Sequence, residues 1–69
     1  MEYLVIVEKA NDGSFSAYVP DLPGCVSCGD TSEDAKVLIR EAIALHIDSL
    51  RLHDEAVPRP SATACLIQA

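Results

Sequence analysis

The sequence predicts an α+β domain in which three strands, one long helix and a final strand follow one another in the order β-β-β-α-β. Three observations predict this order. An Asn11-Asp12-Gly13 turn separates two apolar segments, which is a strong signal for a β-hairpin. A long stretch that begins at Ser32 repeats apolar residues at helical spacing. A proline-containing connection then leads to a last short apolar segment.

The first half of the chain is predicted to form three short antiparallel strands. Residues Tyr3 to Lys9 and Phe15 to Val19 flank the turn and are rich in β-branched and aromatic residues. We expect these two segments to pair as a hairpin. Residues Cys25 to Cys28 are predicted to form the third strand. The basis of this prediction is their position between a chain reversal and the helix, and not their strand propensity.

The chain reversal before the third strand is stiff. Pro20 and Pro23 each fix φ and lack an amide donor, and Gly24 accepts the positive φ that a sharp turn requires. Because a rigid and partly apolar turn loses little entropy on binding, we predict that it docks a partner protein. An architectural hinge without a partner is the alternative. The residues assigned to this partner site are Tyr18, Pro20, Asp21, Leu22, Pro23 and Gly24.

A single helix is predicted from Ser32 to about His53. Thr31 can accept a hydrogen bond from the amide of Asp34, and the Asp34 carboxylate can reach back to Thr31, which forms a capping box with aspartate in place of glutamate. No glycine marks the end of the helix. The stripe expected to pack on the sheet contains Ala35, Leu38, Ile39, Ala42, Ile43, His46 and Leu50.

The end of the chain determines the predicted topology. Val57-Pro58-Arg59-Pro60 forces an extended connection, and Thr63 to Gln68 is predicted to form the last strand. With the usual right-handed crossover, this strand lies beside the first strand and parallel to it. The expected architecture is therefore a four-stranded mixed sheet of order 3-2-1-4 with one helix on one face.

The first and last strands carry apolar side chains on both faces. Alternate residues from Tyr3 to Val7 point to opposite faces, and all of them are apolar, as are Ala64 to Ile67. One helix covers only one face, so we predict a dimer or higher homo-oligomer. A monomer in which Tyr3 and Tyr18 screen the second face is the alternative. The residues assigned to the oligomer interface are Tyr3, Val5, Val7 and Leu66.

Size and charge narrow the class of partner. The 69 residues, 49% of them hydrophobic, make one domain, and a core of this size stabilises by only about 3 to 5 kcal/mol. The formal charge is -6, and the few Lys and Arg residues are scattered. We therefore expect no direct nucleic-acid binding, which needs clustered cations. An acidic surface suits a basic protein partner, although acidity also serves solubility alone.

The sequence contains no signal for export or membrane insertion. Glu2 stands where a secretory signal carries positive charge, and the apolar run after it is about five residues long, against the 18 or more that span a bilayer. A cytoplasmic location without membrane association is predicted. The three cysteines are expected to be reduced in that compartment.

Taken in order, these segments resemble the HicB-type antitoxin family, small proteins that neutralise messenger-RNA-cleaving HicA toxins in bacterial toxin-antitoxin pairs. The resemblance covers nearly the whole chain. The segments that carry it are Tyr3 to Val7, Gly13 to Pro20, Asp21 to Cys25, Gly29 to Thr31, Glu33 to Ala35 and Val57 to Pro60.

This resemblance implies a partial RNase H-like sheet and a non-enzymatic protein that binds a HicA-like toxin and blocks its catalytic surface. Full-length family members usually add a C-terminal DNA-binding domain, which residues 1–69 are expected to lack, so operator binding is not predicted. The alternative is a stand-alone, homo-oligomeric regulatory or ligand-binding module of the same fold without a toxin.

No catalytic, cofactor or metal site is predicted. A two-metal nuclease on such a sheet would need carboxylates on the first strand, and Tyr3 to Val7 contains none. Cys25 and Cys28 point to opposite faces if they lie in a regular strand, and then cannot share a metal; a bulged turn would reverse this conclusion. His46 lies on the apolar stripe with no nucleophile placed beside it, which favours a structural role.

Overall fold

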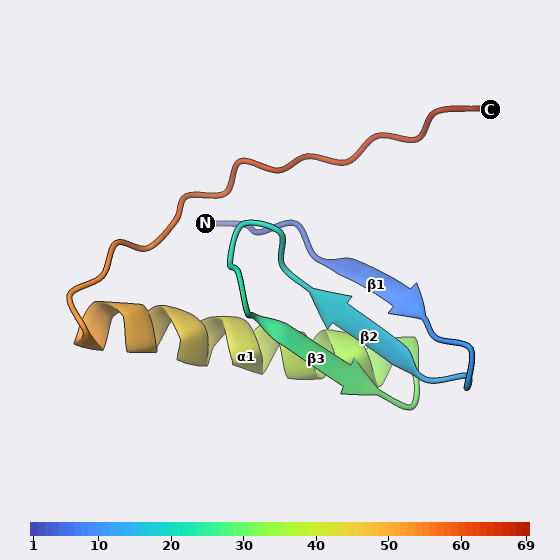
Figure 1. The fold of residues 1–69 in the computed structure, drawn as a ribbon, viewed down its shortest axis with the longest axis horizontal. Helices are drawn as coiled ribbons and strands as arrows, with labels where there is room; N and C mark the ends of the chain where they lie inside the picture. Colours follow the sequence, from blue (N-terminus) through green and yellow to red (C-terminus); the bar gives the residue numbers. More distant parts are fainter.

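A computed structural model describes every residue from Met1 to Ala69. Three short strands precede one long helix: β1 (Ile6–Lys9), β2 (Phe15–Tyr18), β3 (Val26–Gly29) and α1 (Ser32–Leu52). The strands form one layer and the helix lies across one face of it, while the residues after the helix return as an extended tail (Figure 1). The predicted α+β class is confirmed.

The sheet is antiparallel throughout, with β2 between the other two strands in the order β1-β2-β3. The Asp12 carboxylate stabilises the turn of the first hairpin, because it accepts hydrogen bonds from the amide and the hydroxyl of Ser14 at 3.0 and 2.6 Å. The hairpin predicted around Asn11 to Gly13 is confirmed. Its strands are shorter than expected, since residues 3–5 are not paired in the sheet.

A tight loop joins β2 to β3. The amide of Val19 donates to the carbonyl of Cys25 at 3.2 Å, and the amides of Leu22 and Cys25 donate to carbonyls within the loop. Gly24 has a φ of 85°, which only glycine adopts without strain. The loop folds inward, so that Leu22 is completely buried beneath it.

The core lies between the helix and its covered face of the sheet. Ser27 of β3 donates its hydroxyl to the carbonyl of Ala35 at 2.9 Å, which joins the two layers. A Cβ at Gly29 would lie 2.8 Å from the Cβ of Asp34 and 2.9 Å from the amide nitrogen of Ala35, so the layers meet where glycine allows close approach. The fully buried residues are Ala17, Val19, Leu22, Cys25, Ala35 and Ile39.

Residues next to the helix stabilise both ends of α1. Thr31 caps the helix by accepting a hydrogen bond from the amide of Asp34 at 3.1 Å, as predicted, although the Asp34 carboxylate does not accept the return bond from the Thr31 amide. At the other end, Asp54 adopts a φ of 55°, a left-handed conformation that aspartate tolerates better than most residues. Asp54 therefore replaces the glycine that the sequence lacks.

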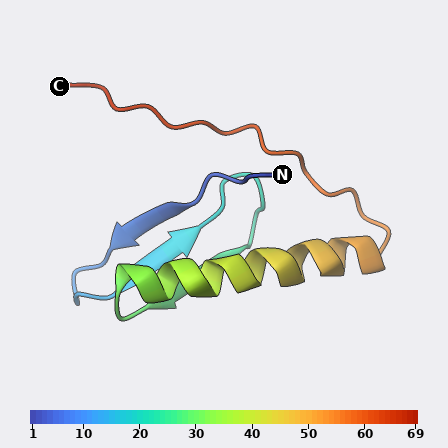
Figure 2. The same cartoon turned by 180° about the vertical axis from the view of Figure 1, so that it is seen from behind.

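The helix is much longer than the strands that it covers. Its 21 residues span about 31 Å, whereas a four-residue strand spans about 13 Å. As a result, the C-terminal half of α1 projects past the sheet (Figures 1 and 2).

The prediction of a four-stranded mixed sheet with order 3-2-1-4 is wrong, because the sheet has three strands and residues 63–68 have no strand partner. Polar contacts draw the tail elsewhere: the Tyr3 hydroxyl donates to the carbonyl of Pro58, and the Asp21 carboxylate binds the amides of Ser61 and Ala62. Pro58 and Pro60 also lack the amides that a strand needs. The tail passes the N-terminal segment, and its end stands clear of β1 (Figures 1 and 2).

Candidate functional site

The cysteines of the C-x-x-C pair lie in different surroundings, since Cys25 ends the loop before β3 and Cys28 is within β3. Cys25 is buried and Cys28 is exposed, and neither forms a disulfide. Burial raises the pKa of the Cys25 thiol, which favours its neutral form. No group of three or more His, Cys, Asp or Glu side chains is arranged to hold a metal ion. The single helix lacks the apolar length that a membrane crossing requires.

The turn predicted to dock a partner is divided between the core and the surface. Leu22 is buried, and Asp21 holds the tail through hydrogen bonds from Ala62 and Ser61 that lower the pKa of its carboxyl. The side chains left on the surface are those of Tyr18, Pro20 and Pro23. Binding of a partner at this turn stays a prediction.

The residues predicted to form an oligomer interface lie in two places. Tyr3, Val5 and Val7 are half-buried and pack against the core on the side covered by the helix. Leu66 is fully exposed on the tail. Self-association stays a prediction, and these positions leave only Leu66 of the set fully accessible.

The open face of the sheet carries a different apolar row. Ile6, Tyr18 and Val26 pair in register across the three strands, so their side chains share one face. Tyr18 is 37% exposed and Val26 is 65% exposed. Because α1 covers the opposite face, no element of the chain shields this row.

The surface that sequence reasoning missed is on α1. Leu38, Leu45 and Leu52 recur every seven residues and are 43%, 70% and 81% exposed. The stripe predicted to pack on the sheet includes Leu38 but neither Leu45 nor Leu52, and the 43% exposure of Leu38 shows that its inclusion is wrong. Their spacing is the signal that could have identified them, because seven residues make nearly two helical turns and place side chains in one row.

An acidic row runs beside these leucines. Asp34, Glu41 and Asp48 are also seven residues apart, and all three are exposed. On a helical projection they lie on the side of the leucines that is remote from the buried positions. We define the leucine face as Leu38, Leu45 and Leu52 together with these three acids.

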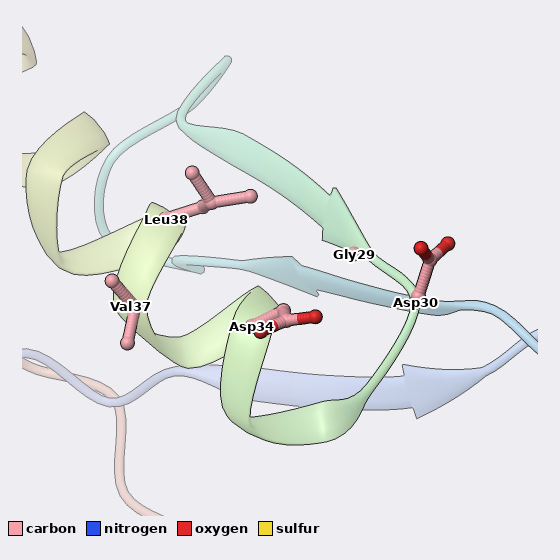
Figure 3. A pocket seen from close by; sticks show the side chains of 5 residues that line it. All are labelled: Gly29, Asp30, Asp34, Val37 and Leu38. Atoms are coloured by element: carbon pink, nitrogen blue, oxygen red, sulfur yellow. The ribbon is translucent and has the colours of Figure 1, made fainter.

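A shallow hollow of about 380 Å³ adjoins the N-terminal end of the leucine face. Figure 3 shows Leu38 and Val37 projecting from α1 on one side, with Asp34 and Asp30 on the other, where β3 gives way to the helix. The hollow therefore combines an apolar wall with two carboxylates.

The other side of α1 has the opposite charge. A second hollow, of about 360 Å³, lies between β1 and the helix, with an apolar lining from Val5, Val7, Ile39 and Ile43. Lys36 and Arg40 also line this hollow. The Lys36 Nζ forms an ion pair with Oε1 of Glu33 at 3.3 Å. The two sides of the helix thus differ, with the acid row on the side of β3 and the two cations on the side of β1.

Comparisons with known proteins give a consistent result. Residues 3–69 match the family described as the HicB_like antitoxin of bacterial toxin-antitoxin system. The UPF0150 protein Ta0767 of Thermoplasma acidophilum is 42% identical over 69 residues, which is the whole of both chains. An uncharacterized 14.9 kDa protein of Haemophilus phage HP1 is 44% identical over 59 residues, 86% of this chain and 44% of the phage protein.

Among solved structures, the fold is similar to the N-terminal domain of the Burkholderia pseudomallei antitoxin HicB. The TM-score is 0.81 at 36% sequence identity, and the match covers 91% of this chain and 74% of that one. The similarity extends over nearly the whole domain, including the arrangement of strands and helix.

Proposed function

The chain belongs to the HicB-like antitoxin family of bacterial toxin-antitoxin systems, and on this premise we propose that it binds a HicA-type, messenger-RNA-cleaving toxin and covers its catalytic surface. The observation that carries the proposal is the family match over residues 3–69, which is supported by the fold similarity to a HicB N-terminal domain. In this proposal the chain acts in the cytoplasm by steric occlusion and performs no chemistry itself.

Charge supports this mechanism. A protein that cleaves RNA must attract a phosphate backbone, so its working surface is basic. This chain carries a formal charge of -6 and presents three acids in a row on α1. Opposite charges accelerate association and fix the orientation of the complex. An acidic domain is therefore suited to occupy the surface that RNA would otherwise use.

The same charge argues against contact with nucleic acid by the domain itself. The five basic residues are scattered along the sequence, whereas a DNA-binding surface needs clustered cations to release counterions. We expect residues 1–69 to leave operator DNA unshifted in a gel at moderate salt.

Co-purification tests the proposal. The chain is tagged and expressed together with a basic reading frame of similar size that neighbours its gene. The expected result is recovery of both proteins in a fixed ratio after washing at moderate salt. Recovery of the tagged chain alone, from this preparation and from the native host, would reject a toxin partner.

A second candidate function is a stand-alone homo-oligomeric module without a toxin. The observation in its favour is the uncovered row formed by Ile6, Tyr18 and Val26, because exposed apolar patches often mark association sites. A pull-down from the native host that returns only copies of this chain would favour it over the antitoxin proposal.

A further inference from the structure

The leucine face combines two features that a solvated helix surface does not need. Its leucines become more exposed from Leu38 to Leu52, because the helix projects beyond the sheet (Figure 2). Its acids form a continuous row beside them. Leucines in a line on a rigid helix offer a preformed apolar seam, and binding to a preformed surface costs little ordering entropy.

We propose that the leucine face docks an amphipathic helical segment of a basic protein, in which apolar residues recur at helical spacing and Lys or Arg residues border them. The proposal rests on the proposed function, and the basic protein is the toxin. The apolar residues of the segment cover Leu45 and Leu52, while its cations face Glu41 and Asp48. The hollow beside Leu38 receives one further side chain, whose positive charge is matched by Asp30 and Asp34 (Figure 3).

A second copy of this chain is a poor occupant. A two-fold interface uses the same patch on both partners. With two antiparallel α1 helices joined along their leucines, the acid row of one copy faces the acid row of the other, because flanking positions meet their own counterparts in that arrangement. The opposite flank is occupied by the sheet, which contacts Ala35 and Ile39. Charge repulsion therefore selects a basic partner over self-pairing.

The test uses the full chain with the toxin that co-purifies with it, and measures affinity by calorimetry. The double replacement Leu45→Lys and Leu52→Lys removes two apolar contacts. It also places two positive charges where they repel the cations of the partner. Each new lysine follows an acid by four residues, Glu41 or Asp48, a spacing that supports the helix. The domain should therefore stay folded, which far-ultraviolet circular dichroism checks. We expect affinity to fall about 100-fold or more, since unpaired charges would be buried.

A matched control distinguishes an effect of the leucine face from an effect of the change in net charge. Ala10→Lys with Ala64→Lys makes the same change in net charge at two exposed positions outside the leucine face, and should change affinity less than about threefold, as expected of distant surface charges. A milder pair, Glu41→Gln with Asp48→Asn, should weaken binding at low salt. The difference in affinity between this variant and the wild type should shrink at high salt, because salt screens exposed charges.

Each outcome decides the proposal. Loss of binding in the lysine pair but not in the control supports it. Unchanged binding in the lysine pair overturns it and leaves the proposed function standing. Equal loss in both pairs overturns it in favour of a general charge effect. A self-associated wild type that the lysine pair dissociates assigns the face to a second copy and also overturns it. No binding of the toxin by the wild type removes the proposed function and this inference together.

Discussion

The carboxylate of Asp21 and the residue Ser61, separated by 40 positions in the sequence, are joined by two hydrogen bonds of 2.9 Å, from the amide and the hydroxyl of Ser61. The amide of Ala62 adds a third, at 3.0 Å. The loop between β2 and β3 thereby fixes the path of the tail, which otherwise touches the body through Tyr3 and Pro58. Together with the prolines of the tail, this contact accounts for the absence of a strand beside β1.

Replacing Asp21→Ala should release the tail. The amides of Ser61 and Ala62 both donate to Oδ2 of Asp21, and the Ser61 hydroxyl donates to Oδ1, so alanine removes every acceptor of this contact. Hydrogen exchange at the amides of Ser61 and Ala62 should accelerate, while α1 keeps its protection. The matched control, Asp12→Ala, removes a carboxylate from the β1–β2 turn and should leave the tail unaffected. Unchanged exchange in the Asp21 variant would disprove the role of this contact.

The same contact should weaken in acid. Hydrogen bonds from Ala62 and Ser61 hold the pKa of Asp21 below its ordinary value of 3.8. A lowered pKa in the folded state means that the contact stabilises fully above the unfolded value and is lost as pH falls through the folded one. The tail should thus stay docked at pH 5 and loosen only below about 3.8. A carboxyl titration by NMR with a midpoint at or above the ordinary value would contradict this.

Gly29→Ala should destabilise the domain by about 1 to 3 kcal/mol, the usual range for overpacking. The new methyl group would lie 2.9 Å from the backbone nitrogen of Ala35, and the helix backbone cannot move away without opening the core. Urea unfolding of the variant measures the change. A free energy of unfolding within about 0.5 kcal/mol of the wild type, the range of neutral surface changes, would show that the layers are less closely packed.

Thr31→Ala should cost about 1 kcal/mol, because it removes the acceptor for the amide of Asp34 at the start of α1. Thr31→Ser keeps that acceptor and should retain most of the stability. Both variants can be compared by their urea midpoints. Equal midpoints for the alanine and serine variants would mean that the hydroxyl does not stabilise the helix.

The uncovered row on the sheet makes a prediction about self-association. Wild-type protein should associate at micromolar concentration, and Val26→Glu should shift it toward monomer, because a charge would replace the most exposed apolar side chain at the β3 end of the row. Sedimentation equilibrium measures both. A wild type that stays monomeric, or a variant that associates equally well, would exclude this row as an interface.

Sequence patterns predicted the local parts of the fold and failed where distant contacts decide the outcome. The hairpin at Asn11 to Gly13 and the cap at Thr31 depend on neighbours within a few residues, so their sequence signals are sufficient. The last strand was wrongly predicted because Asp21, far away in the sequence, captures Ser61 and redirects the tail. No local pattern reveals that pairing.

The candidate surface was missed for a related reason. Leu45 and Leu52 lie outside the stripe that the sequence predicts to pack on the sheet, and nothing in the sequence shows that the row they share with Leu38 is exposed. Only the folded arrangement shows that α1 projects beyond the strands (Figure 1) and leaves these leucines in line with Leu38. The exposure of helix residues depends on how far the helix extends past the sheet. The periodicity of apolar residues in the sequence does not give that length.

Inhibition of RNA cleavage is the decisive assay for whether this domain neutralises a toxin by covering its catalytic surface. The co-purified toxin is separated from this chain, and its cleavage of a labelled messenger RNA is followed as the chain is added back. We expect cleavage to fall to background near one equivalent of domain per toxin, and to persist when the Leu45→Lys, Leu52→Lys variant is added instead. Cleavage that continues at the full rate in a large excess of the wild-type chain would contradict this expectation.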